Sequence, residues 1–242
     1  MHESCKPISG SDLLRPSIVV APHPDDETLG CGGMIIKKRN AGVPVTIVFM
    51  TRGESSHAKW IHKEELAEKR VSEAIAASQK LGVEDRDVVF LDMPDGGVRN
   101  NFRLAKEKLH DTLRTLDFAD VYLPHRWDGP PDHEATYQAA RIALRQTRKE
   151  AVIWQYPVWF WTWPLSRSSG IVDPLLQACR RAAAVRSKKR RVLYVGDVMD
   201  RKLAALEQHA TQVARPAETP EWAILADVAG GGFLDRLLGP HE

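Results

Sequence analysis

Residues 18–33 of the chain read IVVAPHPDDETLGCGG, an apolar run followed by a polar cluster and then by glycines. The apolar run, residues 18–21, stops at Pro22, and apolar residues return at positions 34–36. This pattern predicts a strand, a tight turn and a helix. Because the run is continuous rather than alternating, both faces of the strand should be covered, as they are in a parallel sheet.

Apolar runs and helical periods alternate along the rest of the chain. We expect strands at residues 17–21, 43–50, 87–91, 121–123, 151–155 and 191–195. We expect helices at residues 29–41, 62–81, 101–116, 133–148 and 199–213. This order predicts right-handed βαβ units, and therefore an α/β fold with a mostly parallel sheet flanked by helices. Residues 1–16 are expected to form an extended leader, and residues 164–174 and 215–220 to form loops.

Length and charge narrow the class of protein. The 242 residues suffice for one sizeable core without an evident linker, so we expect a single domain over residues 1–242. The net charge of +2 gives no basic field of the kind that binds nucleic acid, and we interpret the basic run at 186–191 as a solvated loop. Three scattered cysteines form no disulfide framework, which fits a reducing, cytoplasmic compartment. We see neither a signal peptide nor a membrane span.

One imidazole and three carboxylates follow the first predicted strand directly, at residues 23–27. In a parallel α/β sheet, ligands bind where the loops after the strands meet, here residues 22–28, 51–57 and 124–133. Two histidines and a carboxylate are a common catalytic zinc set, so we predict His23, Asp26 and His133 as metal ligands. We predict the neighbouring Asp25 as general base, because a metal lowers the pKa of its water to about 7.

Other interpretations of these residues remain open. Acidic residues also stabilise the N-terminus of a helix, and His133 could be a surface histidine. A two-histidine, one-carboxylate set suits Fe²⁺ as well as Zn²⁺. The glycines at positions 30, 32 and 33 lack the GxGxxG spacing, and the acidic cluster would repel a pyrophosphate, which argues against a dinucleotide site.

The segment PHPDDETLGCGG, residues 22–33, resembles the signature AHPDDExLGxGG of the PIG-L/LmbE-like zinc N-deacetylases. This family includes enzymes that deacetylate N-acetylglucosaminyl intermediates in mycothiol, bacillithiol and glycosylphosphatidylinositol synthesis. Further segments resemble its other motifs: TRGE at 51–54, RVSEAIAASQKLGV at 70–83, FLDMPDG at 90–96, DHEA at 132–135 and the late element at 202–212. The resemblance therefore covers most of the chain.

The resemblance implies a Rossmann-like sheet and removal of an acetyl group from an N-acetylated, glucosamine-containing small molecule. The implied reaction is attack of zinc-bound hydroxide on the acetamide carbonyl. The family pattern also makes His23, Asp26 and His133 the zinc ligands and Asp25 the base. Four further residues are expected to bind substrate: Arg70 and Asp95 near the sugar hydroxyls, Glu54 near the pocket rim, and His209 on a helix end that approaches the pocket.

One departure from the family concerns the segment PPDH, residues 130–133, where the family has HPDH. The family's first histidine assists the tetrahedral intermediate, and Pro130 has no side-chain donor to replace it. Candidates for that role are His57, His125, Arg126 and His209. We predict His125 as the catalytic substitute because it shares the loop. The alternatives are an amidase for another N-acyl or thiol-sugar conjugate, and a catalytically weakened sugar- or metal-binding homologue.

The segment WQYPVWFWTW, residues 154–163, is unusually rich in aromatic side chains. We expect it to pack in the core or in an interface, which leaves a homo-oligomer open. A wall on which a sugar stacks is the alternative, since exposed aromatic side chains mark binding surfaces.

Overall fold

The computed structural model describes residues 5–161, 179–180, 182–184, 186–187 and 189–242. Within them, the central sheet has the strand order β4-β3-β2-β5-β6, and every neighbouring pair is parallel. The strands are β2 (Ser17–Ala21), β3 (Val45–Thr51), β4 (Val88–Met93), β5 (Asp120–Pro124) and β6 (Val152–Tyr156). The predicted α/β fold is therefore confirmed.

The middle strand, β2, is buried along its whole length, as its continuous apolar run predicted. Val19 pairs with Ile47 of β3 on one side and with Tyr122 of β5 on the other. The side chains of β2 alternate between two cores, because successive residues of a strand point to opposite faces of the sheet. Val19 belongs to one core cluster, and Ile18 and Val20 belong to the other.

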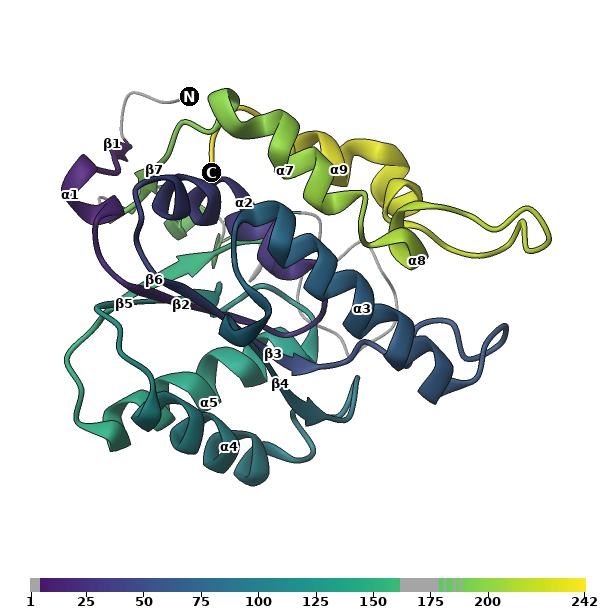
Figure 1. Cartoon of the computed structure of the whole chain (residues 1–242), viewed down its shortest axis with the longest axis horizontal. Helices are drawn as coiled ribbons and strands as arrows, with labels where there is room; N and C mark the ends of the chain where they lie inside the picture. Colours follow the sequence, from purple (N-terminus) through teal and green to yellow (C-terminus); the bar gives the residue numbers. More distant parts are fainter. Residues whose placement is uncertain (1–4, 162–178, 181, 185, 188) are drawn as a thin grey trace.

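Helices cover both faces of the sheet, so the molecule has three layers (Figure 1). On one face, α4 (Phe102–Thr115) packs against α5 (Pro131–Thr147). The other face carries α2 (Asp26–Asn40), α3 (Lys63–Leu81) and α7 (Met199–Leu206), which pack against one another. Further helical segments are α1 (Gly10–Leu13), η1 (Asp85–Asp87), η2 (Gly196–Val198), α8 (Ala210–Val213), η3 (Leu225–Gly231) and α9 (Gly232–Leu237).

Two of the predicted helices differ from the observed ones. The helix expected from residue 29 begins at Asp26, because acidic residues are favourable in the first turn of a helix. The helix expected over 199–213 is interrupted between α7 and α8, at Glu207–His209. The loop expected at 215–220 does lie between α8 and η3, whereas the loop expected at 164–174 lies outside the described residues.

The N-terminal leader and the late strand also differ from expectation. The leader is not extended throughout, because Ser9 and Asp12 form a reciprocal capping box that starts α1. The strand expected at 191–195 is reduced to β7 (Arg191–Val192), which pairs only with β1 (Lys6–Pro7), outside the central sheet. The apolar residues that follow it, Leu193 and Val195, are buried in the core on the α2 side.

Glu242 is held on α7 by an ion pair and on α2 by hydrogen bonds from the backbone. Lys202 is fully buried, and its Nζ lies 2.6 Å from Oε1 of Glu242. The same carboxylate accepts hydrogen bonds from the backbone N–H groups of Gly33 and Met34 at 2.8 and 2.9 Å. There is no room for a side chain at position 33, since a Cβ added to Gly33 would lie 2.3 Å from a methyl group of Val195. The glycine-rich stretch thus allows close packing against the late part of the chain.

The described part of the aromatic segment packs as predicted. Tyr156, Val158 and Phe160 are buried, and the ring of Trp159 stacks on Phe233 of α9 with centroids 4.5 Å apart. Residues 162 and 163 of this segment lie outside the described residues. Among the helices that the structure describes, none combines the length and the apolar character that crossing a membrane requires.

Candidate metal centre

The polar cluster lies where the order of the strands reverses. From β2 the chain proceeds to β3 and β4 on one side of the sheet, and β5 and β6 follow on the other side. The loops after β2 and β5 therefore flank a topological switch point, the place where α/β sheets bind ligands. His23 follows β2, and His133 lies in the first turn of α5, which follows β5.

His23, Asp26 and His133 come together as predicted. Oδ2 of Asp26 lies 3.4 Å from Nδ1 of His23 and 3.3 Å from Nε2 of His133. One ligand atom from each of the three residues falls within 4.8 Å of the others. Burial opposes the charged form of Asp26, but His133 and His23 lower its pKa overall, so this side chain is a carboxylate.

His133 has the environment of a metal ligand. Its side chain is fully buried, and its Nδ1 lies 2.8 Å from Oδ2 of Asp128. Nε2, which faces Asp26, has no hydrogen-bond partner among the described residues. Buried polar atoms are nearly always paired, so an unpaired imidazole nitrogen beside a carboxylate fits a cation. A carboxylate on the other ring nitrogen is the usual support of a ligating histidine.

Asp128 contacts the cluster through His133, and the sequence analysis assigned it no role. It is fully buried and also accepts hydrogen bonds from the backbone N–H groups of Val158, Trp159 and Phe160. These contacts hold its carboxylate toward His133. The signal available in the sequence was its position in the loop after β5, five residues before His133.

A second group of possible ligands, His23, Asp95 and Asp132, shares one histidine with the first. Both carboxylates of the second group already serve other contacts. Asp132 accepts hydrogen bonds from the N–H groups of Gly96 and Val98 at 2.8 and 3.1 Å. Asp95 accepts one from the N–H of Ser55 at 2.7 Å. Asp26 of the first group also accepts the N–H of His23, at 3.0 Å. The first group nevertheless fits a metal better, because it contains the unpaired, buried Nε2 of His133.

Asp25 precedes α2 in an unusual backbone conformation, with φ 118° and ψ −33°. Such a conformation costs on the order of 1–3 kcal/mol for a residue with a side chain and is typical of functional sites. Asp25 is buried, and burial together with the carboxylates of Asp26 and Glu27 raises its pKa well above the ordinary value. Both features fit a group that accepts a proton.

Asp95 and Glu54 reach the cluster from the neighbouring loops. Oδ1 of Asp95 lies 3.2 Å from Nε2 of His23, and the N–H of Asp95 donates to Oε1 of Glu54 at 2.9 Å. Burial opposes the charged form of Asp95, but its hydrogen bond with His23 contributes to a pKa of about 2. The second oxygen of Glu54 is buried without a hydrogen-bond partner among the described residues. The structure thus brings Asp95 to His23, and Glu54 to the backbone of Asp95.

Arg70 is nearly fully buried beneath the loop after β3. Its guanidinium group donates to the carbonyl oxygen of Gly53, contacts Thr211 at 3.3 Å and lies 3.4 Å from Nδ1 of His57. His57 also hydrogen-bonds Ser56 and the carbonyl oxygen of Ala223, so both of its ring nitrogens are in use. These contacts leave His57 no free donor with which to replace the family's histidine.

His125 lies in the loop after β5, with its ring against Phe160 at 4.4 Å between centroids. The N–H of Trp127 donates to its Nδ1 at 3.3 Å, which places the ring proton on Nε2. Burial lowers the pKa of His125 to about 4, so the ring is neutral at pH 7. No hydrogen bond within the described chain uses its Nε2–H, which leaves a donor free.

His209 occupies a different environment from the one predicted. It is fully buried, and its Nε2 lies 2.9 Å from Oε1 of Glu27, which is fully buried as well. With no exposed surface, this side chain supports the loop after β2 instead of facing a substrate. The periodicity of the sequence placed His209 on a helix but could not show which way the ring points.

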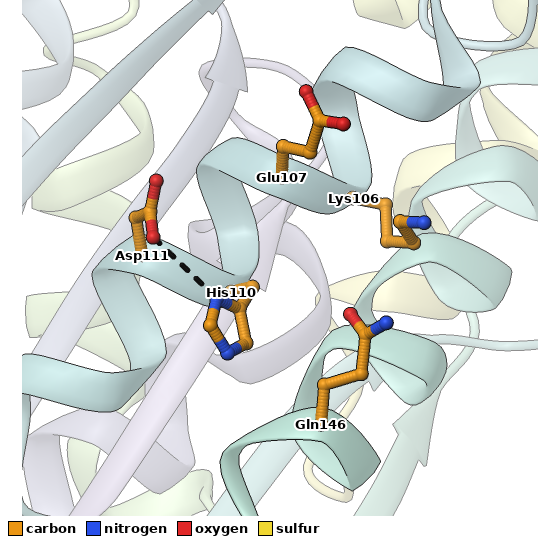
Figure 2. Close-up of a pocket in the computed structure, with 5 residues that line it drawn as sticks. All are labelled: Lys106, Glu107, His110, Asp111 and Gln146. Atoms are coloured by element: carbon orange, nitrogen blue, oxygen red, sulfur yellow. Dashed lines mark ion pairs between the residues drawn. The ribbon is translucent and has the colours of Figure 1, made fainter.

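The surface hollow shown in Figure 2 lies elsewhere. It has a volume of about 390 Å³ and is lined by Lys106, Glu107, His110, Asp111 and Gln146, from α4 and α5. His110 and Asp111 are paired at 3.4 Å across this surface. None of the residues of the metal cluster contributes to it.

An all-parallel α/β sheet with two histidines and a carboxylate gathered at its switch point defines a candidate metal-dependent enzyme. The family model described as "GlcNAc-PI de-N-acetylase", PIG-L, matches residues 18–144, which contain the whole cluster. The chain therefore belongs to the PIG-L family.

Several of the known proteins that the chain resembles are named as deacetylases. The chain is 28% identical to the 1D-myo-inositol 2-acetamido-2-deoxy-alpha-D-glucopyranoside deacetylase of Mycobacterium sp. (strain KMS), over 90% of this chain and 81% of that protein. It is 31% identical to the probable N-acetyl-alpha-D-glucosaminyl L-malate deacetylase 2 of Bacillus anthracis, over 54% of this chain and 59% of that protein. N,N'-diacetylchitobiose deacetylase from Pyrococcus horikoshii has the same fold, with a TM-score of 0.63, 20% identity and coverage of 92% and 77% of the two chains.

Proposed function

We propose that the protein is a zinc-dependent hydrolase that removes the acetyl group from an N-acetylated, N-acetylglucosamine-containing small molecule. Two kinds of support meet in this proposal. The relatives named above are deacetylases of N-acetylglucosaminyl compounds by name. The cluster at the switch point offers two imidazoles and one carboxylate, the donor set of a catalytic zinc site with an open position.

The observation that carries the proposal is the buried, unpaired Nε2 of His133. His23, Asp26 and His133 would hold the metal, and Asp128 would keep His133 in the correct tautomer. When bound, zinc would act as a Lewis acid that polarises a carbonyl oxygen and lowers the pKa of water.

Asp25 is the general base in this proposal. Its carboxylate takes a proton from the attacking water and later delivers it to the departing amine. Its raised pKa suits both steps, because a group that accepts a proton readily can also retain it until the carbon–nitrogen bond breaks.

The substrate-facing residues follow from the contacts around His23. Asp95 and Glu54 present carboxylates that can accept hydrogen bonds from sugar hydroxyls. Arg70 lies beneath the loop that carries Glu54, and we propose that it fixes this loop in addition to any contact with the sugar. His125 donates its Nε2–H to the oxyanion in place of a histidine at position 130.

The direct experiment measures amine release from a panel of N-acetylglucosamine conjugates, with chelator-treated protein and after addition of zinc. Zinc-dependent release from glucosamine-containing substrates, in preference to other acyl amines, is the expected result. Full zinc occupancy without turnover on any acyl amine would contradict the hydrolase proposal. That outcome would favour the weakened homologue that Pro130 suggests.

A further inference from the structure

The backbone of Asp25 requires an explanation beyond the cluster itself. Other non-glycine residues with positive φ in the described chain, Asp92 and Arg148, have φ 49° and 57°, in the ordinary left-handed region. Asp25 has φ 118° with ψ −33°, outside that region. A conformation of this kind persists only where surrounding contacts hold it.

Glu27 makes the contact that holds it. Its Oε2 accepts the backbone N–H of Asp25 at 2.9 Å. Its Oε1 accepts the hydroxyl of Thr28 at 2.6 Å and lies 2.9 Å from Nε2 of His209. A carboxylate excluded from solvent requires donors on both oxygens, and His209 is the donor that comes from outside the loop.

The segment that carries His209 makes a second contact with the loop after β2. Nε2 of Gln212 donates to the carbonyl oxygen of Pro24 at 2.6 Å. Two side chains near α8 therefore hold the single peptide group between Pro24 and Asp25. Gln212 binds its carbonyl oxygen directly, and His209 supports its N–H through Glu27. The interruption between α7 and α8, at Glu207–His209, lies where these contacts begin.

We propose that Glu27 and His209 are a positioning pair, which holds Asp25 in the backbone conformation that places its carboxylate beside Asp26. The inference rests on the role proposed above for Asp25 and assigns His209 a role without substrate contact. His209 is fully buried, so it acts through Glu27 and the Asp25 N–H rather than on the sugar.

The test compares His209→Leu with His209→Gln, whose amide nitrogen can donate where Nε2 does. The first readout is the crystal structure of the zinc-loaded His209→Leu protein, in which we expect Asp25 to relax to a negative φ. The second is kinetic: kcat should fall about a hundredfold in His209→Leu at unchanged KM, the effect of a misplaced catalytic group. His209→Gln should retain the positive φ and most of kcat.

The inference would be overturned if Asp25 kept its positive φ in His209→Leu. It would also be overturned if KM rose in His209→Leu and His209→Gln did not restore it. Should His209→Leu not fold, Glu27→Gln serves the same purpose, because an amide nitrogen accepts no hydrogen bond and one end of the side chain therefore loses its donors. The φ readout is independent of activity. The activity of the Asp25→Asn protein tests whether Asp25 is the base. The structure of His209→Leu separately tests whether His209 positions Asp25.

Discussion

Nδ1 of His133 lies 2.8 Å from Oδ2 of Asp128, and neither side chain is exposed to solvent. The contact fixes the ring so that Nε2 points at Asp26, 3.3 Å away. Asp128 in turn is held by three backbone N–H groups of the segment after β6. The orientation of one proposed metal ligand therefore depends on a segment that begins more than twenty residues later in the chain.

Asp128→Asn should weaken zinc binding about 10–100-fold, the usual effect of removing the carboxylate behind a ligating histidine. The amide cannot accept all of the hydrogen bonds that the carboxylate accepts, so the ring of His133 loses its fixed orientation. Competition with a chelator measures the affinity. Asp111→Asn, at an exposed position on α4, is the matched control and should bind zinc as the unsubstituted protein does. Equal affinities for the two variants would remove Asp128 from the account.

Asp25→Asn should retain bound zinc and lower kcat about 10²–10⁴-fold, because an amide cannot take a proton from water. Metal analysis and the amine-release assay on the same preparation separate the two effects. Asp26→Asn provides the contrast, since loss of a ligand carboxylate should reduce zinc content itself. Normal turnover by Asp25→Asn would exclude it as the base.

His125→Phe should lower kcat roughly a hundredfold or more, the typical loss for one oxyanion donor. Phenylalanine keeps the ring contact with Phe160 but removes the Nε2–H. Adding Pro130→His to this variant should restore much of the rate, because it returns the family's histidine. The combination of a full rate in His125→Phe and a large gain from Pro130→His alone would show that His125 does not fill the role.

His125 should also make the fold sensitive to acid. Burial lowers the pKa of its ring from 6.5 to about 4, so between these values the unfolded chain binds a proton that the folded chain does not. Stability is then lost as the pH falls from 7 toward 4. Urea unfolding at pH 7 and pH 5 should show a smaller loss of stability for His125→Phe than for the unsubstituted protein. Parallel losses would mean that the pKa of His125 is not depressed in the folded state.

Much of the fold could be predicted because its signals are local. The buried run at 18–21 and the glycine after residue 81 mark a strand and a helix end, and both lie where expected. The acidic residues after β2 were assigned to a loop, although they form the first turn of α2. The late strand was predicted too long, because Leu193 and Val195 are apolar for their packing in the core on the α2 side, which no period reveals.

The candidate site also has a part that could be predicted from the sequence and a part that could not. His23, Asp26 and His133 could be predicted because the ends of parallel strands meet at one edge of the sheet. The contact of Asp128 with His133 and that of His209 with Glu27 could not, since both depend on side-chain direction in the folded chain. The pair formed by Glu27 and His209 joins residues 182 positions apart, and only packing brings them together.

The central claim is that one zinc ion binds between His23, Asp26 and His133. An anomalous-difference map, recorded at the zinc absorption edge from crystals of the zinc-loaded protein, tests it most directly. We predict a single peak with the nitrogens of His23 and His133 and an oxygen of Asp26 at about 2.0–2.2 Å. A peak held instead by His23, Asp95 and Asp132, or no peak between the two histidines, would contradict the account.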